Sequence, residues 1–418
     1  MSDKSSLDQT CIIIGASHAG VNLAFSLRKE GWQGEIKLFD ADPILPYHRP
    51  PLSKAYLTSD DEIDKNALKS AESYDKENIN LNLGVSVTKI DAESEQITLS
   101  DNTVHGYDKL VIATGARPLI PPITGIETAT HLYPLRTALD VSNIRKAFNQ
   151  SKQKRVVIIG GGYIGLETAA SLKKLGAKVT VLEREDRILA RVTAPEMSAF
   201  FAKLHADNDV DVFTGKNVTQ IQNCQNENTI ICADGSSYQA DIIIVGVGIR
   251  VNTELAADAG IELENGIKVD ETTATSAANI YAIGDCSYHY NPHYDRFIRL
   301  ESVQNAVDQA KTAAAAINGK QVKYDTLPWF WSDQHDVKLQ MVGLSQGYNQ
   351  IVVRQELDAE NKFSVWYFDN DTLLSVDAVN NAKAYVLGTK FIKSSSKLDK
   401  AKLADANVEL KPANLIQD

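Results

Sequence analysis

Short runs of consecutive apolar residues alternate along the chain with stretches in which apolar positions recur at helical spacing. The runs at 11–14 and 156–159 are each followed by glycine-rich residues and then by an amphipathic stretch, at 21–29 and 166–175. Unbroken apolar runs are typical of parallel strands buried on both faces, and a period of about 3.6 residues is typical of helices that cover such a sheet. The pattern therefore predicts an α/β fold.

The same order of elements occurs twice. After each glycine-rich turn and helix comes a second strand, at 35–39 and 178–182, then a hairpin. Each half closes with an apolar strand that runs into glycine, at 110–115 and 242–248. The agreement extends over about 100 residues and indicates an internal duplication.

Beyond Val251 the pattern returns to that of the first half. A strand is predicted at 280–285 and a long amphipathic helix at 301–318, and a short strand is also expected at 85–87. After Pro328 apolar and polar residues alternate, as in antiparallel strands with one buried face. Strands are predicted there at 337–342, 350–353, 363–367 and 373–379, followed by a helix. We therefore expect a separate C-terminal α+β domain.

The two turns have the glycine spacing of dinucleotide-binding sites. They read Gly15-Ala16-Ser17-His18-Ala19-Gly20 and Gly160-Gly161-Gly162-Tyr163-Ile164-Gly165. The first glycine permits a tight turn, the second lets the backbone approach a pyrophosphate, and the third lets the helix pack closely on the strand. The free N–H groups of the helix then face the phosphates. In the first copy Ser17 stands at the middle position, where its small side chain still permits a close approach.

An acidic residue ends the second strand in each half, Asp40 and Glu183. This is where a ribose hydroxyl of a dinucleotide is held. The structural alternative is a pair of ordinary strand-to-helix turns without a ligand. Two sites in one chain favour a nicotinamide and a flavin dinucleotide held near each other, as electron transfer between them requires.

Composition limits the classes of function. With 418 residues, two or three domains are expected, and 43% hydrophobic and 23% charged residues are typical of a globular enzyme. The net charge of −11 argues against nucleic acid as a partner. No apolar run approaches the ~18 residues of a membrane span. The polar residues 1–10 lead directly into a strand, so no signal peptide and a cytoplasmic location are expected.

The cysteines disfavour thiol chemistry. Cys11, Cys224, Cys232 and Cys286 form no C-x-x-C pair, and no metal site is predicted. A protein-bound iron–sulfur cluster would need about four clustered thiolates. We interpret Cys286 as a packed thiol. Electrons that reach a flavin here would therefore leave the protein.

With these motifs in place, the chain resembles the FAD-dependent ferredoxin and rubredoxin reductases of the pyridine nucleotide-disulphide oxidoreductase superfamily. R-P-P-L-S-K and P-W-F-W-S-D-Q are the most specific motifs. The segments that carry the resemblance are 49–57, 112–115, 160–167, 283–286, 301–306 and 328–334.

The resemblance implies a glutathione-reductase-like fold with two Rossmann-like dinucleotide-binding domains. Residues 1–116 and 250–328 would form a discontinuous FAD domain, 117–249 an NAD(H) domain, and 329–418 the C-terminal α+β domain. The residues implied for FAD are Gly15, Ala19, Gly20, Asp40, Arg49, Lys54, Val87, Ala113, Thr114, Gly115, Arg136, Asp285, Val303 and Trp329. Those implied for NAD(H) are Gly160, Gly162, Tyr163, Ile164, Gly165, Glu183, Gly246 and Gly248.

The resemblance also assigns a reaction. Lys54 and Glu167 would form a pair where the nicotinamide stacks on the flavin, and NADH would give a hydride to FAD. Electrons would then pass singly to a small iron–sulfur ferredoxin that serves an oxygenase. Because soluble ferredoxins are usually acidic, docking would need local basic residues. The candidates are Lys69, Lys311 and Lys338, and a second group of Lys390, Lys393 and Lys397.

Several alternatives stay open. A rubredoxin reductase shares nearly every motif, and a quinone or monodehydroascorbate-type reductase would act on a small molecule directly. A thiol-dependent peroxidase is disfavoured because no cysteine occurs between Gly15 and Cys224. A nucleic-acid-binding scaffold of the apoptosis-inducing-factor type is disfavoured by the net charge.

Overall fold

The computed structural model describes residues 7–224 and 227–417. The expectation about residues 1–10 therefore falls largely outside the described chain. The molecule divides into two compact units. Unit 1 comprises residues up to 48, 62–117 and 249–328, and unit 2 comprises 49–61, 118–248 and 329 onward. The three-domain assignment made from the sequence stays a prediction.

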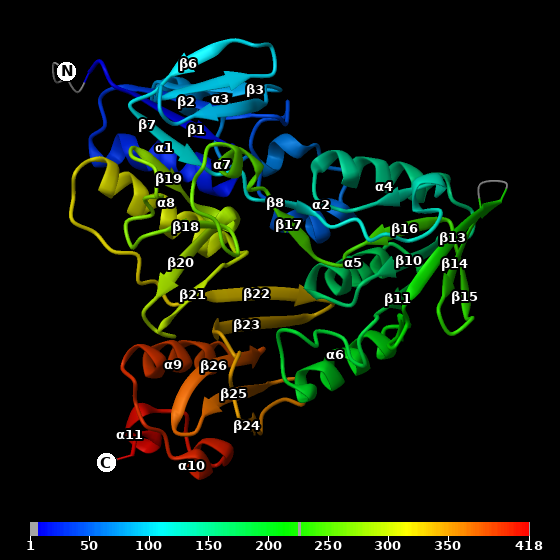
Figure 1. Cartoon of the computed structure of the whole chain (residues 1–418). Coiled ribbons are helices and arrows are strands. Elements are labelled where there is room, and N and C mark those ends of the chain that lie inside the picture. Colours follow the sequence, from blue (N-terminus) through cyan, green and yellow to red (C-terminus); the bar gives the residue numbers. More distant parts are fainter. Residues whose placement is uncertain (1–6, 225–226, 418) are drawn as a thin grey trace. The chain divides into compact units, whose positions relative to one another are not determined.

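Unit 1 is built on a parallel five-stranded sheet with the order β19-β7-β1-β2-β3 (Figure 1). Its central strand β1 is almost wholly buried, and helix α1 packs against helix α8 on the sheet. The elements are β1 (Thr10–Ile14), α1 (His18–Glu30), β2 (Glu35–Asp40), β3 (Ile79–Leu83), β7 (Lys109–Ile112), β19 (Ile280–Ala282) and α8 (Val303–Ile317). Buried apolar residues of α8 belong to the same core cluster as those of α1, and most of them are alanines: Ala306, Ala310, Ala313, Ala314 and Ile317.

Smaller elements complete unit 1. Two three-stranded sheets consist of β4 (Val87–Asp91), β5 (Gln96–Leu99) and β6 (Val104–Gly106), and of β18 (Ile267–Val269), β20 (Ser287–Asn291) and β21 (Arg296–Ile298). The remaining elements are η2 (Ile63–Asn66), α3 (Ala71–Lys76), β8 (Ala116–Pro118), β17 (Ile249–Val251), α7 (Glu254–Asp258) and η4 (Gly284–Cys286).

Two strands predicted in unit 1 are shorter than expected. The strand expected at 85–87 begins only at Val87, because Gly84 turns the chain at φ +71° and the Val85 N–H donates to the Asp40 carbonyl. The strand expected at 280–285 ends at Ala282, since Gly284 has φ +78° and starts a 3₁₀ turn. In both places a left-handed glycine ends or delays the strand.

Unit 2 repeats the architecture with a parallel sheet of order β12-β11-β10-β16-β9. A three-stranded antiparallel sheet, β13-β14-β15, again follows. The elements are η1 (Pro50–Ser53), α2 (Ala55–Thr58), η3 (Ile126–Thr128), β9 (Leu132–Tyr133), α4 (Ala138–Gln150), β10 (Arg155–Ile159), α5 (Tyr163–Lys174), β11 (Lys178–Leu182), α6 (Pro195–Asp207), β12 (Asp211–Phe213), β13 (Val218–Cys224), β14 (Glu227–Cys232), β15 (Ser237–Ala240) and β16 (Ile242–Val245). The duplication predicted from the sequence is thus visible in the order of the strands.

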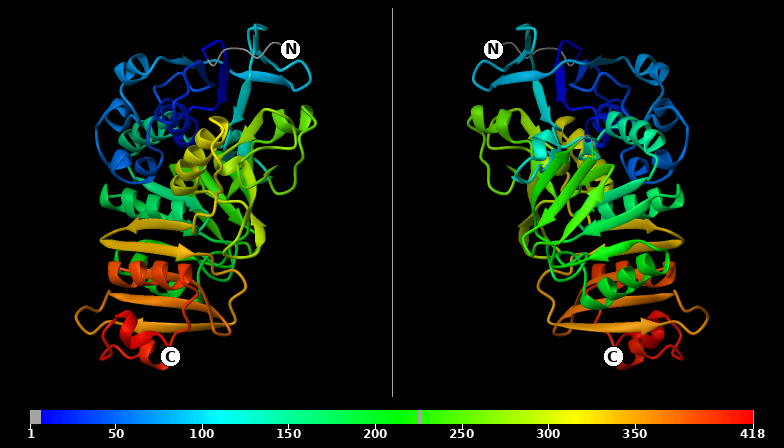
Figure 2. Two further views of the ribbon diagram at one scale, coloured as in Figure 1. Left: turned by 90° about the vertical axis from the view of Figure 1, so that its left-hand side faces the viewer. Right: turned by 90° about the vertical axis from the view of Figure 1, so that its right-hand side faces the viewer.

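The C-terminal part of unit 2 is an antiparallel sheet of order β22-β23-β26-β25-β24, and helix α9 packs on β23 and β26 (Figure 2). The elements are β22 (Trp329–Gln334), β23 (Val337–Gly343), β24 (Gln350–Gln355), β25 (Phe363–Asp369), β26 (Thr372–Val379), α9 (Ala382–Lys393), α10 (Lys400–Ala404) and α11 (Pro412–Leu415). The four predicted strands are present. Strand β22, which was not among the predicted strands, precedes them. Its burial pattern is the reverse of the usual one, because the polar residues Ser332 and Gln334 are buried while Trp329 is 36% exposed.

Within the described ranges, no helix is both long enough and apolar enough to cross a bilayer.

Candidate functional site

The first glycine-rich turn connects β1 to α1 and has no room for larger residues. Gly15 has φ +104°, and a Cβ at this position would overlap the Ala113 carbonyl. A Cβ at Gly20 would overlap the Gly15 carbonyl, so helix and strand touch through this glycine. No side chain caps the helix at Ser17. The turn therefore fits a pyrophosphate at the start of α1.

The second turn has the same construction between β10 and α5. Gly160 has φ +112°, and a Cβ there would overlap the Gly246 carbonyl. A Cβ at Gly165 would overlap the Gly160 carbonyl. A Cβ at Gly162 would meet nothing within 4 Å, and no side chain caps α5 at this residue. The space before the helix is thus free for the phosphates of a dinucleotide.

The two predicted acids lie at the turns. The Asp40 carboxylate accepts hydrogen bonds from the Ala16 N–H at 2.5 Å and from the Asp42 N–H at 2.8 Å. The Glu183 carboxylate accepts from the Gly161 N–H at 2.6 Å and the Glu185 N–H at 2.8 Å. Each acid is therefore held at the edge of its turn, where the ribose of a bound dinucleotide would lie.

Other residues predicted for FAD gather at the same edge of the sheet in unit 1. Strands β1, β7 and β19 are parallel neighbours, so the residues that follow them, Gly15, 113–115 and Asp285, share one edge. Thr114 is fixed there by paired hydrogen bonds with Asn252, at 2.8 and 2.9 Å. A Cβ at Gly284 would lie 3.1 Å from that of Ala19. The 3₁₀ turn that carries Asp285 thus borders the first turn.

Val303 is the first residue of α8, which begins two residues later than the helix predicted at 301–318, and Ser302 caps this helix by accepting a hydrogen bond from the Asn305 N–H at 3.1 Å. Val87 opens β4. Gln309, which was not predicted from the sequence, is a buried amide of α8 whose Oε1 accepts from the Gly284 N–H at 2.7 Å. Gln309 holds the Asp285 turn against α8. In the sequence, this role could have been recognised from the position of Gln309, a polar residue on the apolar face of the predicted helix.

Unit 2 brings Lys54 and Glu167 together. The 3₁₀ turn η1 and the short helix α2 place Lys54 against α5, and its Nζ lies 2.7 Å from Oε2 of Glu167. The Glu167 side chain is 5% exposed and that of Lys54 20% exposed. The two prolines of the motif R-P-P-L-S-K have a local structural role, since Pro50 and Pro51 start the 3₁₀ turn that precedes the lysine.

The Glu167 carboxylate has two further donors. The Ser53 hydroxyl donates to Oε2 and the Ser332 hydroxyl to Oε1, both at 2.7 Å. A buried carboxylate is stable when a cation and full hydrogen bonding offset the loss of hydration. These two serines are not among the site residues predicted from the sequence. The available signal was their position inside the two most specific motifs.

Other predicted residues of unit 2 lie on surrounding elements. Arg49 donates from Nη1 to the Arg136 carbonyl at 2.9 Å. Tyr163 donates from its hydroxyl to Sδ of Met341 at 2.8 Å, and burial raises its pKa well above the usual value. Ile164 is 49% exposed at the start of α5. Gly248 follows β16 with φ +120°.

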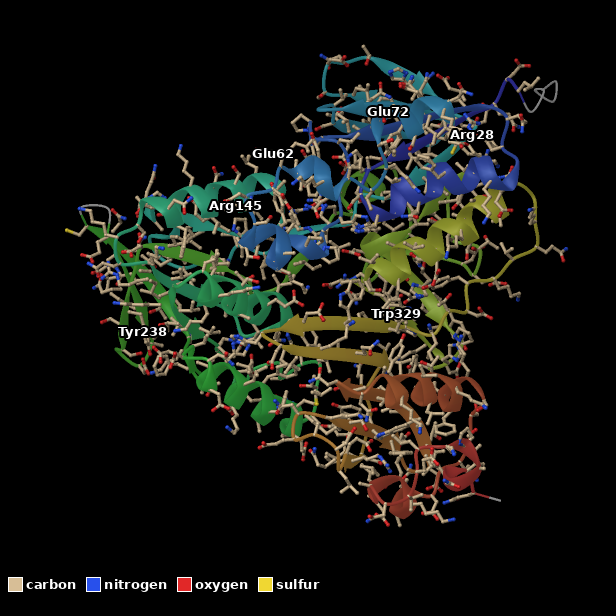
Figure 3. The ribbon with its side chains drawn as sticks, turned by 180° about the vertical axis from the view of Figure 1, so that it is seen from behind. Arg28, Glu62, Glu72, Arg145, Tyr238 and Trp329 are labelled. Carbon is tan, nitrogen blue, oxygen red and sulfur yellow. The ribbon has the colours of Figure 1, made fainter. Side chains whose placement is uncertain are left out.

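Trp329 begins β22, and its ring lies 5.5 Å from that of Trp331 and 6.4 Å from that of Tyr385 (Figure 3). Arg145 of α4, also labelled there, stacks on the Tyr56 ring of α2 at 4.1 Å. The contact between Arg145 and Tyr56 anchors α2, the helix that directly follows Lys54.

All four cysteines are unpaired thiols. Cys286 is fully buried, its Sγ lies 3.3 Å from the Ile283 carbonyl, and burial raises its pKa. The thiol is therefore protonated at neutral pH and packed, as the sequence predicted.

Known proteins resemble this chain over nearly its whole length. The model of the pyridine nucleotide-disulphide oxidoreductase family matches residues 9–310, and that of the reductase C-terminal domain matches 329–414. Putidaredoxin reductase from Pseudomonas putida is 41% identical over 405 residues, covering 96% of this chain and 95% of the relative. A rubredoxin-NAD(+) reductase from the same organism is 36% identical, with 89% and 96% covered.

A solved structure, that of the covalent putidaredoxin reductase–putidaredoxin complex, superposes with a TM-score of 0.92 at 40% identity, covering 97% of each chain. The fold class and the resemblance inferred from the sequence are thereby confirmed. The chain belongs to the pyridine nucleotide-disulphide oxidoreductase family.

Proposed function

We propose that this protein is an NADH-dependent FAD reductase that passes electrons to a small iron–sulfur protein of the ferredoxin type. The proposal is carried by one observation: two dinucleotide turns of the same construction stand in one chain, and the helix of the second presents Glu167 to Lys54. FAD and NAD(H) are the cofactors of the family, and the glycines described above fit both. Bound together, they supply hydride transfer and the splitting of an electron pair.

The residues of unit 1 would hold FAD. We assign the pyrophosphate to the turn at Gly15, the adenosine ribose to Asp40 and a ribityl hydroxyl to Asp285. The N–H groups and dipole at the start of α8, at Val303, would face the flavin pyrimidine, where negative charge develops on reduction. The capping of α8 by Ser302 keeps these N–H groups in place.

The residues of unit 2 would hold NAD(H) and orient the nicotinamide. We assign the pyrophosphate to the turn at Gly160 and the ribose to Glu183. Glu167 would fix the ammonium group of Lys54, and Lys54 would orient the reacting rings. Neither residue needs to transfer a proton, because hydride transfer requires no acid or base. Both are therefore proposed as orienting groups at the reacting centre.

The partner must dock on an acidic protein. In the first group of predicted lysines, Lys311 forms an ion pair with Asp308 at 2.9 Å and Lys69 lies over the Phe25 ring, so only Lys338 stands exposed without such a contact in the described chain. Lys390, Lys393 and Lys397 are exposed near the end of α9, and within the described chain no acid lies in ion-pair distance of these three. We therefore favour this second group for docking an acidic ferredoxin.

The testing experiment is steady-state electron transfer from NADH to candidate ferredoxins and rubredoxins, with ferricyanide as a small acceptor. Reversing Lys390, Lys393 and Lys397 to Glu should raise the KM for ferredoxin and flatten its salt dependence, while the ferricyanide rate stays unchanged. Lys152→Glu, at an exposed loop lysine of unit 2, is the control for a single charge reversal, to be compared with each of the three reversals made alone. Unaltered ferredoxin kinetics in the triple variant would exclude this docking surface, and no reduction of any iron–sulfur protein would exclude the function.

A second candidate is reduction of rubredoxin, which the similarity to a rubredoxin-NAD(+) reductase favours. The same assay separates the two partners through kcat/KM. Direct reduction of a quinone or of monodehydroascorbate is a third candidate, which is tested by supplying each of these molecules as the acceptor in the same assay.

A cytoplasmic location is also proposed. The four unpaired cysteines support it, because thiols stay reduced in that compartment. Cell fractionation tests it.

A further inference from the structure

Polar side chains run through the interior of unit 2 on one side of Glu167. Strand β22 buries Ser332 and Gln334, both 0% exposed, and leaves Trp329 36% exposed. Helix α6 adds His205, also 0% exposed. A strand that buries its polar face breaks the usual pattern, and such exceptions are expected where function requires them.

These side chains form one continuous chain of hydrogen bonds. His335 Nε2 lies 3.4 Å from His205 Nδ1, and His205 Nε2 lies 2.9 Å from Gln334 Oε1. Gln334 Nε2 donates to the Ser332 hydroxyl at 3.2 Å, and this hydroxyl donates to Oε1 of Glu167 at 2.7 Å. The chain thus joins a partly buried residue of the β22–β23 turn to the candidate site.

The direction of every bond follows from the carboxylate. The Ser332 hydroxyl has one hydrogen, and it is donated to the Glu167 carboxylate, which can only accept. The Ser332 oxygen therefore accepts from the Gln334 amide nitrogen. The Gln334 oxygen then accepts from Nε2–H of His205. Burial lowers the pKa of His205 to about 4, so the ring is neutral and its Nδ1 accepts from His335. All donors therefore point toward Glu167.

We propose that His205 and Gln334 are positioning residues for the Lys54–Glu167 pair, acting through Ser332. They hold the Ser332 hydroxyl as a donor to one carboxylate oxygen, which leaves the other oxygen for Lys54 and Ser53. The inference rests on the proposed function of Lys54 and Glu167. A glutamine side chain accepts at oxygen and donates at nitrogen, so the chain transmits orientation and does not carry a proton.

The alternative is a purely structural link between α6 and β22. A structural link would lower stability when broken and leave the chemistry unchanged. The two roles are separated by comparing His205→Leu with Phe201→Leu. Phe201 lies on the same helix, is 0% exposed, and packs on Phe200 outside the hydrogen-bond chain.

The first experiment is anaerobic reduction of the bound flavin by NADH in a stopped-flow instrument. His205→Leu and Gln334→Met should slow reduction at saturating NADH by about fivefold to tenfold, the size expected for one lost hydrogen bond to a charged network. His205→Gln, which retains a donor near the Nε2 position, should recover most of the rate. Phe201→Leu should keep the wild-type rate.

The same variants are then made in a Glu167→Gln background. If His205 acts through the Glu167 charge, His205→Leu should add little there, because the two changes remove one coupled effect. An equal loss in both backgrounds, or an equal loss in Phe201→Leu, would overturn the proposal. So would a wild-type rate in both His205→Leu and Gln334→Met.

The second experiment does not depend on activity. In ¹⁵N-histidine-labelled holoprotein, the His205 resonance, assigned from the His205→Gln variant, should report a neutral ring protonated at Nε2 and should shift in Gln334→Met. Protonation at Nδ1 would overturn the bond order given above. If NADH fails to reduce the wild-type flavin, that measurement excludes the proposed function. The tautomer of His205 then still decides whether the series of hydrogen bonds from His335 to Glu167 exists.

Discussion

Asn22 and Glu167 occupy the same position in the two halves of the chain, each two residues after the last glycine of its turn. Asn22 donates from Nδ2 to the His18 carbonyl at 2.7 Å, within its own helix. Glu167 accepts from Lys54, Ser53 and Ser332. The duplicated turn and helix form the proposed dinucleotide site in both halves, and a side chain two residues beyond the last glycine distinguishes them.

The first turns of helices α1 and α5 also differ in how much of their surface is exposed. Ala19 of α1 is 8% exposed, whereas Ile164, its counterpart in α5, is 49% exposed. Helix α1 is covered by α8 within its unit. A covered helix suits a cofactor that stays bound, and a more open helix suits one that must enter and leave in each turnover.

The largest effects should come from the first glycine of each turn. Gly15→Val should give colourless or unstable protein, because the new side chain overlaps the Ala113 carbonyl and φ +104° is strained for valine. Gly160→Val should remain yellow but lose reduction by NADH, roughly 100-fold or more. Absorption spectra and flavin reduction by NADH and dithionite measure both. Equal loss of FAD in the two variants would contradict the assignment of one dinucleotide to each half.

The next largest effect should be a difference in kcat/KM for NADH between substitutions at Glu167 and at Asn22. Glu167→Gln leaves the ammonium of Lys54 without its partner, so kcat/KM for NADH should fall about 10- to 100-fold with FAD content unchanged. Asn22→Ala should alter the same constant less than about twofold, because it loses only a bond within α1. A stronger effect at Asn22 would reverse the comparison.

Glu183 should set the preference for NADH over NADPH by accepting the ribose 2′-hydroxyl and repelling a 2′-phosphate. The nearby arginines are engaged elsewhere, since Arg187 donates to Ser198 at 2.7 Å and Arg184 pairs with Glu185 at 2.8 Å. Glu183→Ala should therefore narrow the preference, by about tenfold. The ratio of kcat/KM values for the two nucleotides is the measurement, and a wild-type preference for NADPH would refute the assignment.

Each unit also buries one neutral histidine beside a glutamine, His289 with Gln309 and His205 with Gln334. Burial lowers the pKa of each histidine to about 4, below the unfolded value of 6.5. The unfolded chain then binds more protons, so stability is lost as the pH falls from 6.5 toward 4, by about 3 kcal/mol for each histidine. Asp377, whose pKa burial raises to about 7, acts in the opposite direction.

Thermal unfolding at pH 7 and pH 5 tests this predicted loss of stability on acidification. The decrease in Tm on acidification should be smaller in His205→Gln and in His289→Gln than in the wild type. A decrease of the same size in all three proteins would show that other groups control acid stability.

The smallest effect is expected at Cys286. Cys286→Ala should keep most NADH-driven activity, because the thiol is buried and protonated. A folded variant whose flavin NADH no longer reduces would reveal a thiol mechanism.

The sequence by itself determined most of the main strands and helices and the positions of both glycine-rich turns, because their rules are local. Apolar runs locate the parallel strands, glycine spacing locates the turns, and an acid at the end of the second strand locates Asp40 and Glu183. The family and the α/β fold followed from the same motifs and are confirmed. The roles of the individual site residues stay predictions.

The tertiary structure alone decided what surrounds Glu167. Ser53 lies 114 residues and Ser332 165 residues from it along the chain, and His205 lies 129 residues from Gln334. No local period relates such positions, and polar residues on a strand normally indicate an exposed face. They can be recognised as buried only when α5, α6 and β22 pack together, because that packing removes water and leaves the carboxylate to be satisfied by side chains.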